Sequence, residues 1–140
     1  MPKLVIANWK MHKNIEQADE FCQCLDVRGD NYIIAPPMHI MAYLVNKFPN
    51  IKFAAQDIST ISEPEGAFTG EISARLLKDI AVNYAIIGHS ERRQYLAETN
   101  KQTRQKILNA QNAGITAIIC IGESQQIRAD GQYLEYITNE

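Results

Sequence analysis

The sequence is poor in the residues and patterns that mark specialised classes of protein. Its 140 residues include only three cysteines, an odd number that does not suit a disulfide framework. Cys22 and Cys24 lie two positions apart and would point in different directions on a helix, and no second pair of ligands follows at zinc-finger spacing. We therefore expect free thiols, no metal site and no cofactor.

An excess of charge of either sign is also absent. The 14 lysines and arginines stand against 16 acidic residues, which gives a net charge of −2 and a pI of about 5.9. Because no basic stripe is available for a phosphate backbone, nucleic acid is not an expected partner. A small anion could still bind locally.

The start of the chain has no long apolar run. LVIA at 4–7 is followed by Asn8 and is too short for a signal-peptide core or a membrane span. The sequence therefore predicts a cytoplasmic protein with no membrane segment. With 46% hydrophobic and 21% charged residues and no Pro/Gly/Ser-rich linker, it also predicts one compact domain or one piece of a domain.

What the sequence does contain is a recurring apolar run rich in β-branched residues. The runs are LVIA at 4–7, YIIAP at 32–36, FAAQ at 53–56, YAIIG at 84–88 and TAIICIG at 116–122. They are continuous rather than alternating, which is typical of strands buried on both faces of a parallel sheet covered by helices. Their first residues lie 21 to 32 positions apart, which leaves room for a crossover helix in each interval.

Between these runs, apolar residues recur with a helical period. One helix face carries Ile15, Ala18, Cys22 and Leu25, and another carries Met41, Leu44, Val45 and Phe48. A third helical segment, 100–114, ends at Gly114, as expected of a left-handed C-cap. The alternation of strands and helices predicts an α/β fold with a parallel sheet.

One connection is longer than the others. The segment 57–71, DISTISEPEGAFTGE, is about twice the usual length of a strand-to-helix loop. Long loops are often functional, but the glycines and proline in this one are equally compatible with a mobile excursion.

The chemically useful side chains gather at the exits of the predicted strands, where α/β proteins bind their ligands. The first exit offers Asn8 and Lys10, the fourth offers His89, Ser90 and Glu91, and the fifth offers Glu123. Together they supply a cation for a phosphate or an oxyanion, an imidazole for proton transfer or hydrogen bonding, and carboxylates that orient their neighbours.

Each of these residues also has a structural interpretation. A lone lysine at a strand exit is usually solvated, and His89 could be a capping residue or a satisfied core histidine. Glu91 followed by two arginines could be only the hydrated start of a helix, and Trp9 is better explained by packing. The coincidence of reactive residues at strand exits favours the functional interpretation.

Four stretches resemble the triose-phosphate isomerase family. They are ANWKMHKN at 7–14, AQDIS with GAFTGE at 55–71, IIGHSERR at 86–93 and CIGES with a following arginine and glycine at 120–131. The resemblance runs in order over nearly the whole chain. It implies the TIM (β/α)8 barrel fold, here a partial barrel of five parallel strand-helix units. Residues 1–140 would then be a single N-terminal portion of the barrel domain, truncated before strand six.

The resemblance also implies a role for each site residue in the interconversion of dihydroxyacetone phosphate and D-glyceraldehyde 3-phosphate in glycolysis and gluconeogenesis. His89 would be the electrophile that polarises the substrate carbonyl, a neutral histidine in this family. Lys10 would attract the phosphorylated substrate and stabilise the enediolate, and Asn8 would help to hold the substrate. Glu91 would organise Lys10 and the catalytic base, and Ser90 would steady that base. Thr69, at the tip of the long loop, would contact the partner subunit's active site in a homodimer.

The sequence departs from the family in one large respect. The family's general base is a glutamate in a stretch like AYEPVWAIGTG after strand six, and no such stretch occurs in these residues. Three alternatives therefore stay open: part of an isomerase that a second polypeptide chain supplying the missing barrel units could complete, an inactive truncated remnant, or a non-enzymatic phosphate-binding α/β module of flavodoxin-like type. The flavodoxin-like module is the weakest, because no Gly-rich phosphate turn follows the first strand.

Overall fold

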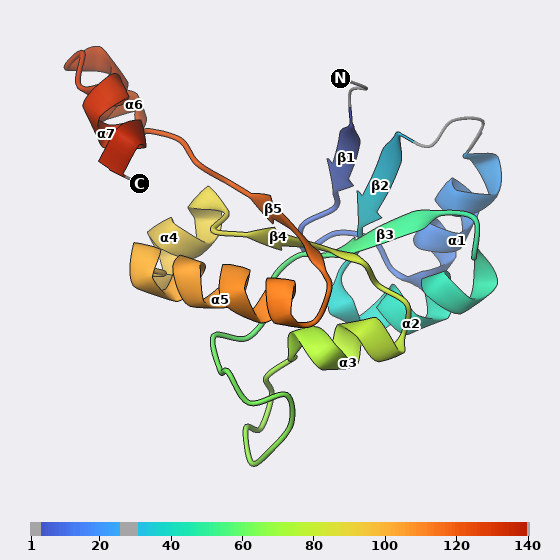
Figure 1. Cartoon of the computed structure of the whole chain (residues 1–140). Coiled ribbons are helices and arrows are strands. Elements are labelled where there is room, and N and C mark those ends of the chain that lie inside the picture. Colours follow the sequence, from blue (N-terminus) through green and yellow to red (C-terminus); the bar gives the residue numbers. More distant parts are fainter. Residues whose placement is uncertain (1–3, 26–30, 140) are drawn as a thin grey trace.

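The computed structural model describes residues 4–25 and 31–139, in which strands and helices alternate along the chain (Figure 1). The order is β1 (Val5–Asn8), α1 (Ile15–Cys24), β2 (Tyr32–Ala35), α2 (Met38–Lys47), β3 (Lys52–Ala55), α3 (Ala74–Asp79), β4 (Tyr84–Ile87), α4 (Ser90–Leu96), α5 (Asn100–Asn112), β5 (Thr116–Ile119), α6 (Gln125–Ala129) and α7 (Tyr133–Asn139).

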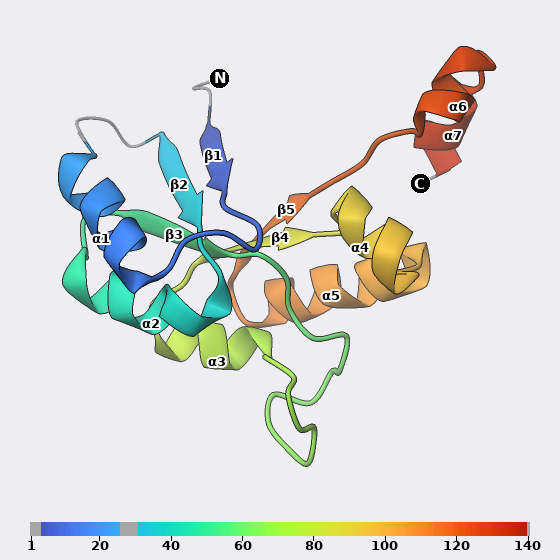
Figure 2. The same cartoon turned by 180° about the vertical axis from the view of Figure 1, so that it is seen from behind.

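The strands form one sheet in the order β1-β2-β3-β4-β5, and every neighbouring pair is parallel. Helices α1, α2, α3 and α5 lie on one side of this sheet, while the other side carries no helix among the described residues (Figures 1 and 2). Strand order therefore follows chain order, as in a barrel that winds in one direction. The prediction of an α/β fold with five parallel strand-helix units is confirmed.

The two faces of the sheet bury different residues because successive side chains on a strand point to opposite sides. Toward the helices, Ile34, Phe53 and Ile87 join the main hydrophobic core. Toward the other side, Ile33 and Ile86 belong to a smaller cluster. The continuous apolar runs predict strands that are buried on both faces. The central strands β2, β3 and β4 have this burial over most of their residues.

Helix α1 begins at a capping box. The Asn14 side chain accepts from the Gln17 backbone, and the Gln17 side chain accepts from the Asn14 backbone. Ala18 and Cys22 are buried as predicted, but Ile15 is 51% exposed. The prediction for Ile15 was wrong because this first helical residue lies at the margin of the face that α1 turns to the core.

Helices α2 and α5 follow the sequence pattern more closely. Met41 and Leu44 are fully buried, and Val45 and Phe48 pack at the edge of the core. Helix α5 ends two residues before Gly114, whose φ of 68° is the left-handed conformation expected beyond a helix end.

Strands β1 and β5 are less buried than the sequence predicted. Val5 is 52% exposed and Ile119 is 49% exposed, and β5 as a whole has no buried residue. Continuous apolar runs predict burial on both faces, but β1 pairs only with β2 and β5 pairs only with β4 in the described part of the chain. The two strands are the edges of an open sheet, as a partial barrel of five strand-helix units implies.

The chain leaves the sheet earlier than predicted. The fifth run was expected to be a strand over 116–122, but β5 ends at Ile119, and Cys120 beyond it is only half-buried. Helices α6 and α7 lie beside each other and away from the sheet (Figures 1 and 2). None of the helices described is both long and apolar enough to cross a membrane.

The open edges lead to a prediction about self-association. Apolar strand edges without charged residues are templates for pairing, so we expect a polypeptide of residues 1–140 to self-associate at about ten micromolar and above. Replacing Ile119 by lysine should reduce this association because a charge on the edge strand opposes pairing. Sedimentation velocity measures both effects.

Ala42→Lys is the matched control because it adds the same charge at an exposed position of α2. It should leave the sedimentation profile unchanged. A monomeric parent polypeptide, or an equal effect of both lysines, would contradict the role given to the sheet edge.

Candidate active site

The exits of β1, β3 and β4 converge on one cavity of about 380 Å³. Its lining consists of Asn8, Lys10, Met11, His12, Gln56, Asp57, His89, Glu91 and Arg92. These residues are up to 84 positions apart in the chain and meet only because the parallel strands end on the same side of the sheet. The prediction that Asn8, Lys10, His89 and Glu91 come together agrees with this arrangement.

The loop after β1 presents Lys10 in an uncommon backbone conformation. Its φ of 54° lies in the left-handed region, which costs a residue with a side chain about 1–2 kcal/mol. The Lys10 backbone N–H donates to Asn8 Oδ1 at 2.9 Å, which closes a tight turn at the strand exit. The Lys10 side chain reaches Glu91 in the first turn of α4.

Lys10 and Glu91 form an ion pair across the cavity. The Nζ atom lies 2.6 Å from Glu91 Oε1, and both side chains are about half exposed, at 48% and 44%. The hydrogen bond from Lys10 is the main cause that holds the pKa of Glu91 below its ordinary value. The site therefore keeps a charged ammonium and a charged carboxylate in contact at neutral pH.

His89 lies directly before α4 and is largely buried. Its Nδ1 atom accepts from the backbone N–H of Glu91 at 3.3 Å. The same Nδ1 atom lies 3.5 Å from Glu91 Oε2, so both the backbone and the side chain of Glu91 face this edge of the imidazole ring. His89 therefore caps α4 and also lines the cavity. The sequence left open whether His89 is a capping residue or a site residue, and its position in the structure is compatible with both.

Gly88 makes the turn between β4 and His89 possible. Its φ is 74°, and a Cβ atom at this position would lie only 3.0 Å from Thr103 Cγ2 of α5. A larger residue would be strained by this positive φ and would have to displace the side chain of Thr103. The positive φ and the contact with Thr103 therefore explain why the fourth apolar run ends in a glycine.

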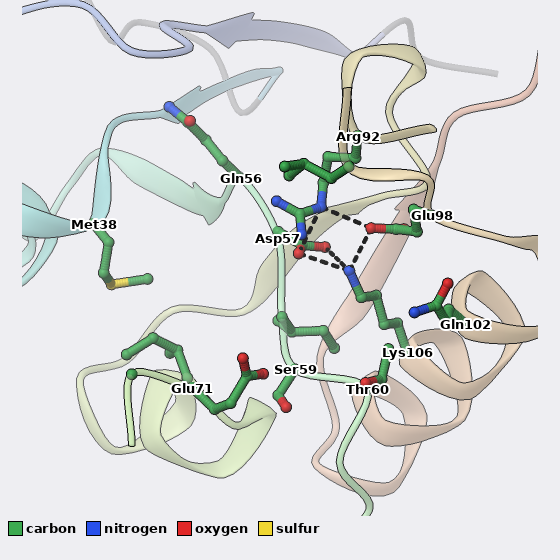
Figure 3. Close-up of a pocket in the computed structure, with 14 residues that line it drawn as sticks. Met38, Gln56, Asp57, Ser59, Thr60, Glu71, Arg92, Glu98, Gln102 and Lys106 are labelled. Atoms are coloured by element: carbon green, nitrogen blue, oxygen red, sulfur yellow. Dashed lines mark hydrogen bonds and ion pairs between the residues drawn. The ribbon is translucent and has the colours of Figure 1, made fainter. Parts of the chain in front are cut away.

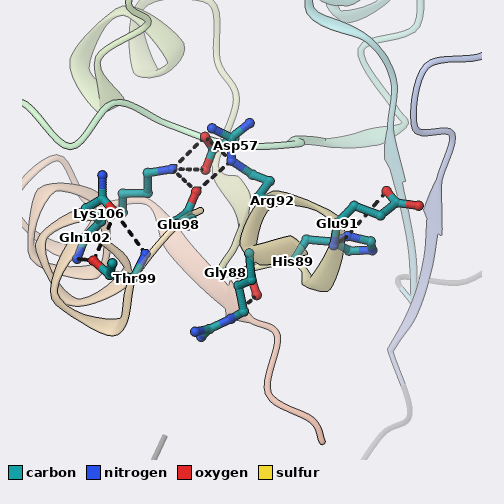
Figure 4. A network of polar contacts seen from close by, with 10 residues as sticks. Asp57, Gly88, His89, Glu91, Arg92, Glu98, Thr99, Gln102 and Lys106 are labelled. Atoms are coloured by element: carbon teal, nitrogen blue, oxygen red, sulfur yellow. Dashed lines mark hydrogen bonds and ion pairs between the residues drawn. The ribbon is translucent and has the colours of Figure 1, made fainter. Parts of the chain in front are cut away.

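Beside the cavity lies a cluster of four charged residues that joins β3, α4 and α5, which we call the charge cluster: Asp57, Arg92, Glu98 and Lys106 (Figures 3 and 4). Lys106 Nζ lies 2.7 Å from Asp57 Oδ2 and 2.6 Å from Glu98 Oε2. Arg92 Nε lies 2.8 Å from Asp57 and 2.7 Å from Glu98. The Lys106 and Glu98 side chains are each only 4% exposed.

The pKa values of the two carboxylates of the charge cluster are shifted in opposite directions. Burial raises the pKa of Asp57 even though Lys106 and Arg92 act against it. Burial also opposes the charge of Glu98, but hydrogen bonds from Lys106 and Arg92 outweigh it and lower the pKa of that residue. Two cations and two carboxylates thus balance one another in a largely dry environment.

A second cavity, of about 440 Å³, is lined by all four residues of the charge cluster (Figure 3). It is bounded by the loop 57–71 and by α4 and α5, and it shares Gln56, Asp57 and Arg92 with the first cavity. These three residues therefore form the wall between the two spaces.

The remaining predicted residues do not line the first cavity. Ser90 is the exposed first residue of α4, and Thr69 is exposed on the long loop, which leaves the body of the chain between β3 and α3 (Figure 1). Glu123 pairs with Arg128 after β5. No group of three or more metal-binding side chains occurs in the described residues, and Cys22 is buried while Cys24 is exposed.

Sequence reasoning gave no role to Gln56 or to the charge cluster. AQD follows the third apolar run directly, so the rule that pointed to the first and fourth strand exits also applies to Gln56 and Asp57. No comparable signal marks Glu98 or Lys106, because their partners are set by how α5 packs on the sheet.

Five parallel strands in chain order, with the covering helices on one side and polar residues at the strand exits, match part of a TIM barrel rather than a doubly wound sheet. Within the class of TIM-barrel proteins, the chain belongs to the triosephosphate isomerase family, whose family model matches residues 3–140. The resemblance seen in the sequence is thereby confirmed.

Similar proteins agree with this assignment. The chain is 37% identical to the triosephosphate isomerase of Orientia tsutsugamushi (strain Boryong) over 100% of its own length and 59% of that protein. It is 39% identical to the triosephosphate isomerase of Idiomarina loihiensis over 98% of its length and 56% of that protein. The crystal structure of triosephosphate isomerase from Bartonella henselae matches with a TM-score of 0.90 and 29% identity, covering 99% of this chain and 60% of that one.

The chain therefore spans less than two thirds of the length of the relatives it matches.

The charge cluster leads to a prediction about stability. Lys106→Met should lower the free energy of unfolding by about 3–5 kcal/mol, because it leaves Glu98 and Asp57 with a buried negative charge that Arg92 alone must balance. Urea denaturation followed by circular dichroism measures the change.

Lys101→Met is the control, since Lys101 lies on the same helix and is exposed. It should change the free energy of unfolding by no more than about 0.5 kcal/mol. A loss below about 1 kcal/mol for Lys106→Met, the size of a surface ion pair, would contradict a buried cluster.

Proposed function

We propose that the protein acts as a triosephosphate isomerase, interconverting dihydroxyacetone phosphate and D-glyceraldehyde 3-phosphate through an enediolate in the cytoplasm. The observation that carries this proposal is the meeting of Lys10, His89 and Glu91 around one cavity, each at its position in a family motif. The reaction needs no cofactor, because it moves one proton between two carbons and one between two oxygens.

The cation of Lys10 serves the substrate in two ways. It attracts the negatively charged phosphorylated triose, and it stabilises the charge that develops on the substrate oxygens as the enediolate forms. A fixed ammonium group favours the transition state because it does not have to reorganise when that charge appears. Glu91 keeps the ammonium in place through the 2.6 Å ion pair.

His89 is suited to act on the substrate carbonyl. Because Nδ1 faces Glu91 at the start of α4, Nε2 is the ring nitrogen that would donate a hydrogen bond to the substrate carbonyl oxygen. This hydrogen bond strengthens as the carbonyl becomes an enediolate, so it stabilises the transition state more than the bound substrate. Asn8 would help to hold the substrate, and Ser90 would steady the catalytic base.

The base itself is expected from a part of the protein beyond these 140 residues. In the family it is a glutamate in a stretch like AYEPVWAIGTG, which these residues do not contain. The proposed activity therefore belongs to a protein in which the remaining barrel units are present, whether on the same polypeptide or on a second one.

A homodimer is part of the same proposal. Loop 57–71 leaves the body of the chain, and its base is held by Asn109, which donates to the carbonyls of Ser59 and Ile61. An anchored base with an exposed tip suits a loop that reaches into a partner subunit. Thr69 at this tip would then contact the region of the partner's Lys10.

In the protein with a complete barrel, His89→Gln should reduce kcat by about 10²- to 10⁴-fold and change KM much less. The glutamine amide can donate from about the same place, but it is a weaker hydrogen-bond donor than an imidazole and cannot exchange a proton with the substrate oxygens. A coupled assay of triose-phosphate turnover measures both parameters. His39→Gln, on the exposed surface of α2, is the control and should leave them unchanged. An unchanged kcat for His89→Gln would exclude the electrophile role.

The polypeptide of residues 1–140 should show no turnover on its own, because a proton cannot be removed from the substrate carbon without a positioned carboxylate. Mixing it with a polypeptide that supplies the other three strand-helix units should restore turnover in the coupled assay. Turnover by residues 1–140 alone would contradict the role given to the missing base. Failure of the mixture, with both polypeptides folded and bound to each other, would favour an inactive remnant or a phosphate-binding module.

A further inference from the structure

Lys10 is held in its left-handed conformation by two side-chain amides from two different strand exits. Its backbone N–H donates to Asn8 Oδ1 at 2.9 Å, and its backbone carbonyl accepts from Gln56 Nε2 at 2.7 Å. Both peptide groups that flank the Lys10 side chain are thus bound. An unfavourable backbone conformation of this kind persists only where its surroundings fix it from several directions.

Gln56 also fixes the strand next to β1. Its Nε2 atom donates a second hydrogen bond, of 2.8 Å, to the carbonyl of Ala35 at the end of β2. The same carbonyl accepts from the backbone N–H of Trp9 at 3.0 Å. One amide group therefore ties the exit of β3 to the end of β2 and to the loop after β1, and uses both of its hydrogens to do so.

The Gln56 side chain is directed to the loop after β1 and to the end of β2, and Gln56 is not a member of the charge cluster. It follows the last residue of β3, is half-buried, and lies in the wall between the two cavities. Its side chain points away from Asp57 and Lys106 (Figure 3).

We propose that Gln56 is a positioning residue for the proposed isomerase reaction: by binding the Lys10 carbonyl it holds the Lys10 ammonium against Glu91 and toward the substrate. This inference rests on the proposed function only for its effect on turnover. Its structural consequence, the position of the Lys10 ammonium, is independent of any activity.

Gln56→Met tests this role, because methionine fills nearly the same volume but donates no hydrogen bond. In the protein with a complete barrel, we expect kcat/KM to fall by about 10²-fold, the loss that a misplacement of about 1 Å can cause. Both kcat and KM should worsen, since Lys10 acts on the bound substrate and on the transition state. Gln23→Met is the control, because Gln23 makes a comparable hydrogen bond to Asp19 on the surface of α1.

A second measurement follows the Lys10–Glu91 contact itself. The hydrogen bond from Lys10 keeps the pKa of Glu91 below its ordinary value, so a displaced Lys10 should let that pKa rise toward the ordinary value. Carboxyl-carbon NMR of glutamate-labelled protein measures it, and Glu91→Gln identifies the resonance. Gln56→Glu, which keeps the length of the side chain but loses the donor at neutral pH, serves if Gln56→Met does not fold.

The possible outcomes separate the two proposals. A raised pKa of Glu91 together with a lower kcat/KM supports the positioning role. A raised pKa in a protein that shows no isomerase activity supports the positioning role and defeats the proposed function. An unchanged pKa of Glu91 overturns the positioning role, whether kcat/KM falls or not.

Discussion

The arrangement of the candidate site depends on the contacts that the buried ammonium group of Lys106 makes. It binds Asp57 at the exit of β3 and Glu98 before α5, and the same two carboxylates bind Arg92 of α4. Because a buried charge that loses its partner is costly, these three elements cannot separate without a large loss of stability. Arg92 directly follows Glu91, so the charge cluster also determines where the start of α4 lies (Figure 4).

The opposite wall of the site is built from weaker contacts that act on the backbone. The loop after β1 is fixed by hydrogen bonds to Lys10 from Asn8 and Gln56, and its left-handed residue directs the lysine side chain across the cavity. The Lys10–Glu91 ion pair then joins this loop to α4. A half-exposed ion pair contributes little to stability, so its value lies in placing a cation rather than in holding the fold.

Much of the fold could be predicted from the sequence because strand runs, helical periods and strand exits are local patterns. Lys10 and His89 were predicted as site residues in this way, since each lies within three positions of the end of an apolar run. The partners of Glu98 and Lys106 could not be found, because Lys106 lies 49 positions from Asp57 and the pairing depends on how α5 packs on the sheet. The exposure of Val5 and Ile119 does not follow from the apolar runs alone, but it does follow from a partial barrel of five units, in which the first and last strands are unpaired edges.

Two departures of the chain from local preference lie at the candidate site or beside it. A lysine in the left-handed region and a lysine buried among carboxylates are both unfavourable by themselves, and each persists because several neighbours fix it. The consequence is a site whose two walls are set before a substrate arrives, one by backbone hydrogen bonds at Lys10 and the other by the charge cluster behind α4. Electrostatic stabilisation of an enediolate requires such fixed groups, since a cation that must move into place would lose much of its advantage over water.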